Sequence, residues 1–554
     1  MHLRPLRAPS LRCWLAGAII TLATGCSSIQ PWQNAPARPG QPAPEAPQRS
    51  IVAALTLSGG GARAAAFGLG VLRELKDTRF DWDGHPTTLF DEISLVSGVS
   101  GGSILAAHFA AFGDETLTRF EPDFLLDHVE ADLITTALTP RGLYRLGSPW
   151  FGRSHLLAER LDRLYGGRTF GDLAKRKRAP DLLVTATDLT TGAPFEFSPK
   201  QFELICSDLS SVPLSFAVAS SSAVPILLTP MTLRNYAGQC PAPPLAAPPT
   251  GSGDSFRARV LHATARSYLD AHERPFLHLV DGGVSDNLGV RSLIDQVVAG
   301  GSFQATFRGA APGSIRQLLL IAVNSERDLA ERIDRSDRVP STGQVMDALL
   351  FGAGARETQV TLAMLDEDVQ RWSRELHAQR GVQGSPFAAD AQINVISISL
   401  RDIDDPTLRR SVLQVPTAFT ITPQDVTRLQ EAGRAALRGS AEFQRLRRSL
   451  GAASASEDMP SAPWRRTDEL HSPDPQEAPL NDPRAENPDR RGARRHIRRR
   501  GRENRLDAGG RQCPDAAPGS GARIRALRPY SPLGPAQRDG ASDTAACARA
   551  GALV

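Results

Sequence analysis

The chain has 554 residues, a hydrophobic fraction of 41% and a formal net charge of +4. This length is enough for one large domain or two medium ones, and the modest apolar fraction predicts that part of the chain lies outside any core. So small a net charge for this length gives no support to nucleic-acid binding.

Residues 1–25 have the features of an export signal. Arginines precede the apolar run 14–22, which is too short to span a bilayer comfortably, and small residues follow it. Cys26 comes directly after them, and this arrangement resembles the lipobox of bacterial lipoproteins. The resemblance implies that Cys26 is lipidated, and Ser27 in the next position implies an outer-membrane lipoprotein that faces the periplasm. Plain secretion is the alternative.

Residues 26–50 are rich in Pro, Ala and Gln and carry no hydrophobic period, so we predict a flexible tether. Export leads to an oxidising compartment, in which pairs of cysteines can form stable disulfides. We therefore predict a disulfide between Cys206 and Cys240. Two buried free thiols are the alternative.

From residue 51 to 450, apolar runs of strand length alternate with helical patterns. Such alternation predicts a largely parallel sheet covered on both faces. The expected strands span 51–58, 93–96, 180–187, 276–280, 318–323 and 393–400, and the expected helices span 64–75, 103–110, 214–219, 346–365 and 423–450. The stretch 77–84 is expected to form a loop. The Pro-rich and Gly-rich segment 241–255 is also expected to be a loop, and its role as a lid is left open.

Residues 451–554 differ in character from the rest of the chain. Pro, Arg, Gly, Ala and Asp dominate, and apolar residues are sparse and without pattern. Such a segment buries too little surface to offset its chain entropy, so we predict a disordered C-terminal tail. Its arginine run at 490–500 is expected to be solvated, with contact to anionic lipid headgroups as the alternative.

A candidate nucleophile follows the second predicted strand. The run that ends at Val96 stops at Gly98-Val99-Ser100-Gly101-Gly102, and a helical pattern begins directly afterwards. A serine in a tight strand-to-helix turn is lifted out of the sheet, and only small neighbours allow the backbone to make that turn. We therefore predict that Ser100 is a nucleophile.

A glycine loop ends the first predicted strand and opens the first helix. Backbone N–H groups in such a loop converge on negative charge, so Gly59, Gly60 and Gly61 suit a developing oxyanion. Arg63 is expected to stabilise either this loop or the phosphate of a substrate. A dinucleotide-binding loop would need an acidic residue that closes a second strand about twenty residues on, and the stretch 77–84 holds three aspartates but has the pattern of a loop.

A base for Ser100 is expected at Asp281, which ends an apolar strand before the turn Gly282-Gly283. A carboxylate in that position can reach a site at the end of the sheet, although an Asp-Gly-Gly sequence on its own indicates only a turn. Histidine is the more usual base. His108, His278 and His377 all lie away from glycine-marked strand ends, so we expect structural roles for them.

Together these motifs resemble the patatin-like phospholipases. The resemblance rests on Gly59–Arg63, Gly98–Gly102 and Asp281–Gly283, supported by the patches 186–192 and 219–225, and it covers roughly residues 51–450. It implies a three-layer α/β/α domain and a Ser100–Asp281 dyad without histidine. It also implies an oxyanion hole formed by the amides of Gly59, Gly60 and Gly61.

The implied activity is that of a serine lipid acyl hydrolase, similar to a phospholipase A, that cleaves ester-linked fatty acids without a cofactor or metal. Membrane phospholipid is the expected substrate and partner, and no nucleic acid is expected. Two alternatives remain open. One is an acyltransferase or thioesterase that uses the same dyad. The other is a non-catalytic envelope lipoprotein that retains the fold of an ancestral enzyme.

Overall fold

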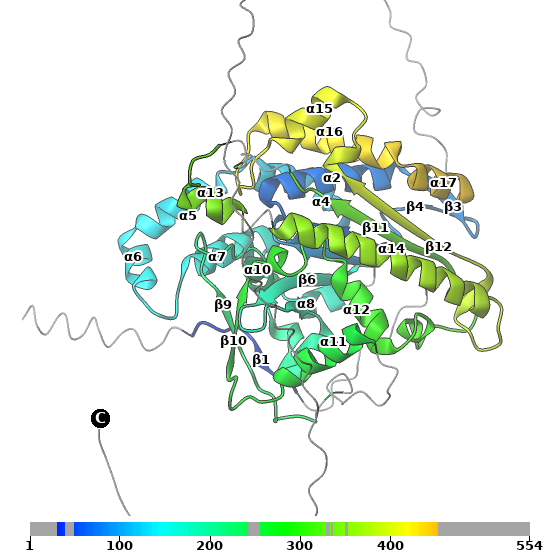
Figure 1. Ribbon diagram of the computed structural model, residues 1–554, viewed down its shortest axis with the longest axis horizontal. Coiled ribbons are helices and arrows are strands. Elements are labelled where there is room, and N and C mark those ends of the chain that lie inside the picture. Colours follow the sequence, from blue (N-terminus) through cyan, green and yellow to red (C-terminus); the bar gives the residue numbers. More distant parts are fainter. Residues whose placement is uncertain are drawn as a thin grey trace, which may run out of the picture. The chain divides into compact units, whose positions relative to one another are not determined.

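The computed structural model describes residues 30–38, 49–176, 178–241, 243, 255–327, 333, 336–348 and 353–451 (Figure 1). All of them belong to the first of two compact units, Met1–Trp464 and Arg465–Val554. The predicted export signal, Cys26, most of the 241–255 loop and all but the first residue of the predicted tail lie outside the described residues. Within the described residues, no helix is long and apolar enough to cross a membrane.

An eight-stranded sheet forms the centre of the described domain. Five strands are parallel, in the order β12-β11-β2-β5-β6, and β7, β9 and β10 are antiparallel additions at one end. The prediction of a largely parallel sheet is therefore confirmed. The strands are β2 (Ile51–Leu57), β5 (Ile93–Val99), β6 (Asp181–Asp188), β7 (Pro194–Phe197), β9 (Met231–Arg234), β10 (Phe276–Val280), β11 (Ile315–Asn324) and β12 (Phe387–Ser399).

The C-terminal ends of β5 and β10 meet beside β6. Thr185 of β6 pairs with Val99, and Thr187 pairs with Val280. Residues 184–187 of β6 also pair with β7. Because a strand residue has one neighbouring strand on each side, β7 lies along the edge of β6 opposite to β5 and β10. β5 and β10 therefore run toward each other along the same edge of β6. Their ends lie two β6 residues apart, which is roughly 7 Å.

Helices cover both faces of the sheet. In Figure 1, α2 and α16 lie on one side of β11 and β12, and α14 lies on the other. The helices are α2 (Gly61–Asp77), α3 (Gly101–Phe112), α4 (Thr116–Phe120), α5 (Val129–Leu138), α6 (Pro140–Leu146), α7 (Arg153–Tyr165), α8 (Phe170–Ala174), α9 (Pro199–Leu204), α10 (Leu214–Ser221), α11 (Phe256–Ser267), α12 (Arg291–Gly300), α13 (Thr342–Asp347), α14 (Ala353–Gln379), α15 (Pro406–Leu413), α16 (Pro423–Gly439) and α17 (Ala441–Ser449).

Two hydrophobic clusters fill the space between these layers. Ile51, Ala53 and Leu55 of β2 belong to the first cluster, with side chains from α2, α3, α10 and α16. Val52 of the same strand packs against the second cluster, which includes side chains from α12 and α14. Successive strand residues point to opposite faces, so the two clusters lie on opposite sides of the sheet. The expected α/β/α layering is confirmed.

Several predicted elements differ in extent from those observed. The helix expected to end at 365 continues in α14 to Gln379, because Leu365, Trp372 and Leu376 keep a buried helical stripe through a polar sequence. The expected loop 77–84 instead contains β3 (Arg79–Trp82), which pairs with β4 (His85–Thr88). Asp83-Gly84 joins them with positive φ at both residues, as a tight hairpin turn requires.

Part of the predicted tether is packed against the domain, so for residues 30–38 the prediction of a flexible segment was wrong. β1 (Ala35–Pro36) pairs with β8 (Ser207–Asp208). Asn34 is buried and donates hydrogen bonds of 2.9 Å to the Ser207 hydroxyl and to the carbonyl of Arg234. These polar partners fix a segment whose composition alone predicts no order.

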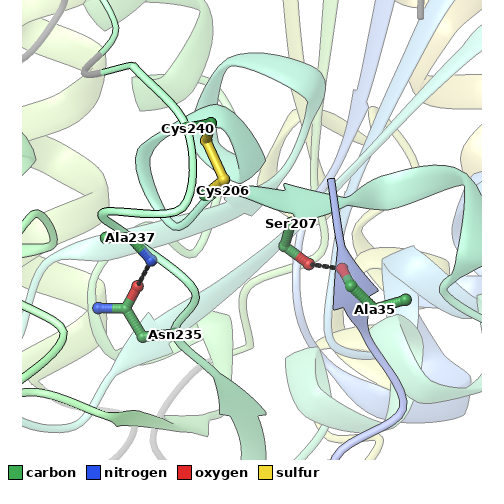
Figure 2. The surroundings of a disulfide bond; sticks show 6 residues. All are labelled: Ala35, Cys206, Ser207, Asn235, Ala237 and Cys240. Carbon is green, nitrogen blue, oxygen red and sulfur yellow. Dashed lines mark hydrogen bonds between the residues drawn. A yellow bond between two sulfur atoms is a disulfide. The ribbon is translucent and has the colours of Figure 1, made fainter. Parts of the chain in front are cut away.

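The predicted cysteine pair lies directly beside this strand. Cys206 and Cys240 are joined by a disulfide in the structure, with their Cα atoms 5.9 Å apart (Figure 2). Cys206 immediately precedes β8, and the amide of Ala37 donates to its carbonyl over 2.9 Å. The disulfide therefore links the start of β8 to the segment after β9. Residues 30–38 pack against the domain at the same place.

Candidate active site

Ser100 occupies the sharp turn between β5 and α3. Its backbone has φ 48° and ψ −123°, a conformation that residues other than glycine rarely adopt. The glycines around it allow close backbone packing. A Cβ on Gly98 would lie 2.5 Å from the Cα of Ser103, and one on Gly101 would lie 2.1 Å from the carbonyl oxygen of Gly61. The Gly-x-Ser-x-Gly sequence therefore forms the strained turn that it predicts.

Asp281 faces Ser100 where β10 meets β5. The Ser100 hydroxyl donates a hydrogen bond of 2.8 Å to Oδ2 of Asp281, and the amide of Gly283 donates one of 2.8 Å to Oδ1. Ser100 is 7% exposed and Asp281 is 8% exposed. The structure thus brings together the two side chains that the sequence predicts, at nucleophile-to-base distance.

Burial raises the pKa of Asp281 to about 6, and the hydrogen bonds from Gly283 and Ser100 oppose part of this rise. The carboxyl is therefore mostly ionised at neutral pH and still basic enough to take a proton from a hydroxyl that attacks a carbonyl. This balance is what a general base near neutral pH needs.

The backbone around Asp281 is held from both sides. Its amide donates to the carbonyl of Ala223 over 3.0 Å, and its carbonyl accepts from the Thr187 hydroxyl over 2.8 Å. A Cβ on Gly282 would lie 2.1 Å from the carbonyl oxygen of Thr185, so a glycine is required at that position. These contacts fix the direction in which the carboxylate points.

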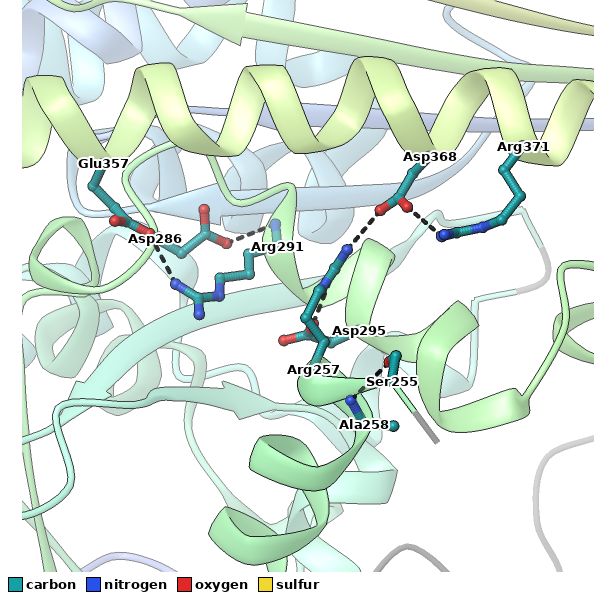
Figure 3. A network of polar contacts seen from close by, with 9 residues as sticks. All are labelled: Ser255, Arg257, Ala258, Asp286, Arg291, Asp295, Glu357, Asp368 and Arg371. Carbon is teal, nitrogen blue, oxygen red and sulfur yellow. Dashed lines mark hydrogen bonds and ion pairs between the residues drawn. The ribbon is translucent and has the colours of Figure 1, made fainter. Parts of the chain in front are cut away.

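A polar network anchors the segment that follows Asp281 (Figure 3). The buried carboxylate of Asp286 accepts from the amide of Arg291 over 3.0 Å, and burial raises the pKa of Asp286 to about 6. The Arg291 guanidinium pairs with Glu357 over 2.8 Å, and Arg257 pairs with Asp368 over 2.9 Å. Helices α11, α12 and α14 are therefore linked beneath the turn that carries Asp281.

Ser221, at the end of α10, is a site residue that sequence reasoning missed. Its hydroxyl accepts a hydrogen bond of 2.8 Å from the amide of Ser100 and donates one of 2.6 Å to the carbonyl of Thr185. The side chain is fully buried. It therefore ties the strained turn to β6. The only sequence signal was its place in the patch 219–225, where three consecutive serines look equivalent.

The glycine loop lies beside Ser100, since a Cβ on Gly59 would be 3.4 Å from the Cβ of Ser100. The amide of Gly59, however, donates to the carbonyl of Asn287 over 3.0 Å and is not available to an oxyanion in this structure. The amides of Gly60 and Gly61 have no acceptor among the residues that the structure describes. The predicted trio of donors is thereby reduced to two.

Arg63 stabilises the loop and does not reach toward a substrate. The guanidinium is buried and donates to the carbonyls of Ser325 and Val415, each over 2.9 Å, and to the Thr417 hydroxyl over 3.0 Å. Burial lowers the pKa of Arg63 to about 9. Of the two roles that the sequence leaves open, the structure favours the support of the loop.

The three histidines have other partners. His108 is buried between Phe112 and Phe120 and bonds the Thr116 hydroxyl over 2.9 Å, and burial lowers its pKa to about 3. His278 bonds Thr232, and His377 bonds Arg380. In the described part of the chain, no group of three or more His, Cys, Asp or Glu residues is placed to hold a metal ion.

Comparison with known proteins identifies one domain of this chain. Residues 55–294 match the family model described as Patatin-like phospholipase. The matched segment is a patatin-like phospholipase domain, and in the structure the central sheet continues beyond the match, because β11 pairs with β2.

Solved structures of low similarity accompany this match. Human GIVD cytosolic phospholipase A2 has 16% identity and a TM-score of 0.35, covering 73% of this chain and 62% of that one. VipD from Legionella pneumophila has 13% identity and a TM-score of 0.29, covering 76% and 70%. The chain thus spans less than two thirds of the human protein. No curated protein that was compared matches the sequence.

Proposed function

We propose that this protein hydrolyses the fatty-acid esters of membrane glycerophospholipids, with Ser100 as nucleophile and Asp281 as base. One observation carries the proposal: the hydroxyl on a strained strand-to-helix turn donates a 2.8 Å hydrogen bond to a buried carboxylate. A serine needs an adjacent base to become a nucleophile, and a carboxylate with a pKa of about 6 is suited to that task.

In the first half-reaction, the Ser100 oxygen attacks the ester carbonyl carbon while Asp281 takes the hydroxyl proton. The tetrahedral intermediate then collapses, the bond to the glycerol oxygen breaks, and Asp281 returns the proton to this leaving group. An acyl-serine and a lysophospholipid result. In the second half-reaction, Asp281 takes a proton from water as the water oxygen attacks the acyl-serine. Fatty acid leaves, and Ser100 recovers its proton.

The amides of Gly60 and Gly61 are the proposed donors to the oxyanion. They lie at the N-terminus of α2, which spans 17 residues, so the helix dipole adds positive potential at the same point. Neither amide is occupied by another described residue, in contrast to that of Gly59. Losing one such donor typically costs on the order of a hundredfold in rate.

The proposed location is the outer membrane, with the chain lipidated at Cys26 and facing the periplasm. The N-terminal sequence supports this, and a cysteine pair at disulfide distance is in keeping with an oxidising compartment. Metabolic labelling with radioactive palmitate tests it. The parent is expected to be labelled and Cys26→Ala is not, and equal labelling of the two would refute lipidation at this residue.

A fluorophosphonate probe tests the nucleophile, because it reacts with activated serines and leaves a covalent label. The parent is expected to be labelled, Ser100→Ala is expected to remain unlabelled, and Asp281→Asn is expected to react far more slowly. Ser94→Ala on the same strand is the control, because its hydroxyl bonds the backbone of Ala53. Equal labelling of the parent and Ser100→Ala would remove Ser100 from the mechanism.

Product analysis tests the reaction. Vesicles of phosphatidylglycerol with a labelled acyl chain are expected to give free labelled fatty acid and lysophospholipid in equal amounts. Transfer of the label to a second lipid, with no free fatty acid, would instead establish an acyltransferase. In either case Ser100→Ala must be inactive if the dyad carries the chemistry.

A further inference from the structure

Two segments near the site combine exposed apolar side chains with positive charge. The first, residues 133–158, contains Arg141, Arg145 and Arg153; Arg145 pairs with Glu159 just beyond the segment, whereas Arg141 and Arg153 form no ion pair with another described residue. The second, residues 223–238, contains one arginine and no acidic residue. Arg141 and Arg153 therefore leave positive charge beside the apolar side chains of the first stretch.

Large apolar side chains stand out from both segments into solvent. We define the apolar rim by six residues that are between 43% and 67% exposed: Ile134, Leu138, Leu143, Trp150, Ile226 and Leu227. The first three lie on α5 and α6, which Figure 1 shows next to α7. Single exposed apolar residues are ordinary, whereas six on adjoining segments indicate a surface that meets something apolar.

Hydrogen bonds join the two segments into one surface. The Arg153 guanidinium donates to the carbonyl of Ile226 over 2.5 Å, and the Ser154 hydroxyl donates to the carbonyl of Thr229 over 2.5 Å. Ile226 has φ 74°, a strained conformation for a β-branched residue. The loop that presents Ile226 and Leu227 is therefore held in a defined shape against the start of α7.

The rim is continuous with the candidate active site on two sides. Ala223, three residues before Ile226, accepts the amide hydrogen of Asp281 through its carbonyl. At the start of α5, the carboxylate of Glu130 accepts from the amide of Phe419 over 2.8 Å, and the neighbouring carbonyl of Ala418 accepts from the amide of Ala62 beside the glycine loop. The segments that carry the rim are therefore bonded to the elements that hold Asp281 and the glycine loop.

We infer that the apolar rim, with Arg141 and Arg153 beside it, docks on an anionic phospholipid surface and delivers the ester bond to Ser100. The inference rests on the proposed function and adds the surface through which the enzyme meets its substrate. Apolar side chains enter the acyl boundary, Trp150 suits the headgroup level, and arginines pair with lipid phosphates. A second copy of the chain is disfavoured, because a dimer through this surface would bring together two copies of the same positive charge.

Sedimentation with vesicles tests the docking separately from catalysis. A form of the protein that comprises residues 27–554 carries Ser100→Ala so that no turnover occurs and lacks Cys26 so that no anchor contributes. It is expected to bind vesicles with 30 mol% phosphatidylglycerol at least tenfold more tightly than vesicles of phosphatidylcholine alone, and this preference is expected to shrink at high salt. Equal binding to both vesicle types would overturn the proposed anionic surface.

Exposed substitutions test the rim itself. Leu138→Ser with Leu227→Ser is expected to weaken vesicle binding at least tenfold and, on a Ser100 background, to leave the hydrolysis of a soluble short-chain ester within twofold. Phe256→Ser with Val260→Ser removes equally exposed apolar groups from α11 and is the matched control. Equal losses in both pairs, or a change from dimer to monomer in light scattering with vesicle binding intact, would overturn the inference.

A failure of the proposed function would look different. An enzyme that binds vesicles through the rim and releases no fatty acid would refute hydrolysis and support the docking surface. An enzyme that cleaves both soluble and vesicle esters equally well with and without the rim residues would refute docking and leave the dyad in place.

Discussion

Replacement of Ser221 by alanine is expected to slow the enzyme by loosening the turn that holds its nucleophile. The hydroxyl bridges two buried backbone groups, the amide of Ser100 and the carbonyl of Thr185. Ser221→Ala leaves both without their partner, and an unpaired buried group costs about 1–3 kcal/mol. Two such groups together are expected to cost about 2–6 kcal/mol of stability.

The effect on rate follows from the strain at Ser100. A side-chain-bearing residue at φ 48° and ψ −123° lies about 1–3 kcal/mol above relaxed backbone and persists only where its surroundings hold it. If the bond from Ser221 supplies about 1.4 kcal/mol of that restraint, kcat falls roughly tenfold in its absence. KM is expected to change little, because Ser221 is buried behind the turn and does not face the substrate.

Steady-state kinetics on a soluble ester and urea unfolding measure the two effects. Ser220→Ala is the matched control: its hydroxyl is equally buried on the same helix and bonds only the carbonyl of Phe216, over 2.8 Å. It is expected to lose about 1 kcal/mol of stability and no more than twofold in kcat. Equal kcat for the two variants, whether both low or both unchanged, would refute the positioning role.

Three further predictions concern other parts of the structure. Because Asp281 acts as the ionised base and burial raises its pKa to about 6, kcat/KM is expected to fall tenfold per pH unit below that value. Its folded pKa exceeds that of the unfolded chain, so its ionisation destabilises the fold as pH rises from about 4 to 6, and Asp281→Asn should be inactive yet more stable above pH 6. Arg63→Lys cannot serve three acceptors in the same fork and should lose about 2–4 kcal/mol in urea unfolding. Reduction of the Cys206–Cys240 disulfide, which spans 34 residues of sequence, should cost roughly 3–4 kcal/mol.

Each of these has a clear contrary result. A pH profile that is flat between 5 and 8, or an Asp281→Asn variant that unfolds more easily at pH 8 than the parent, would refute the assignment of the base. Arg445→Lys, at an exposed ion pair, is the control for Arg63, and equal stability losses would contradict the role of loop support. A reductant that lowers the Tm of the double variant Cys206→Ser/Cys240→Ser as much as that of the parent would contradict the disulfide prediction.

The sequence alone was sufficient for the layered fold and for the elements that meet at the site. Strand-length apolar runs, each followed by a glycine turn and a helical pattern, specify a parallel α/β sheet through local periodicity. The glycines at positions 98 and 101 also indicated the tight turn from the sequence alone, because only a residue without a side chain fits so close a backbone approach. Ser100 and Asp281 were found because each ends a strand at such a turn.

The tertiary structure decided how those pieces meet. β10 is antiparallel to β6, and Asp281 reaches Ser100 only because β10 pairs with β6 just beyond the end of β5. Strand direction depends on contacts between distant segments, and no local pattern encodes it. Tertiary contacts also decide that the amide of Gly59 donates to the carbonyl of Asn287. They likewise decide which of the three serines at 220–222 accepts from the amide of Ser100, because only the packing of α10 places Ser221 there. Periodicity and backbone sterics are local and can be predicted from the sequence, whereas the partners in the Gly59–Asn287 and Ser100–Ser221 hydrogen bonds lie more than a hundred positions apart.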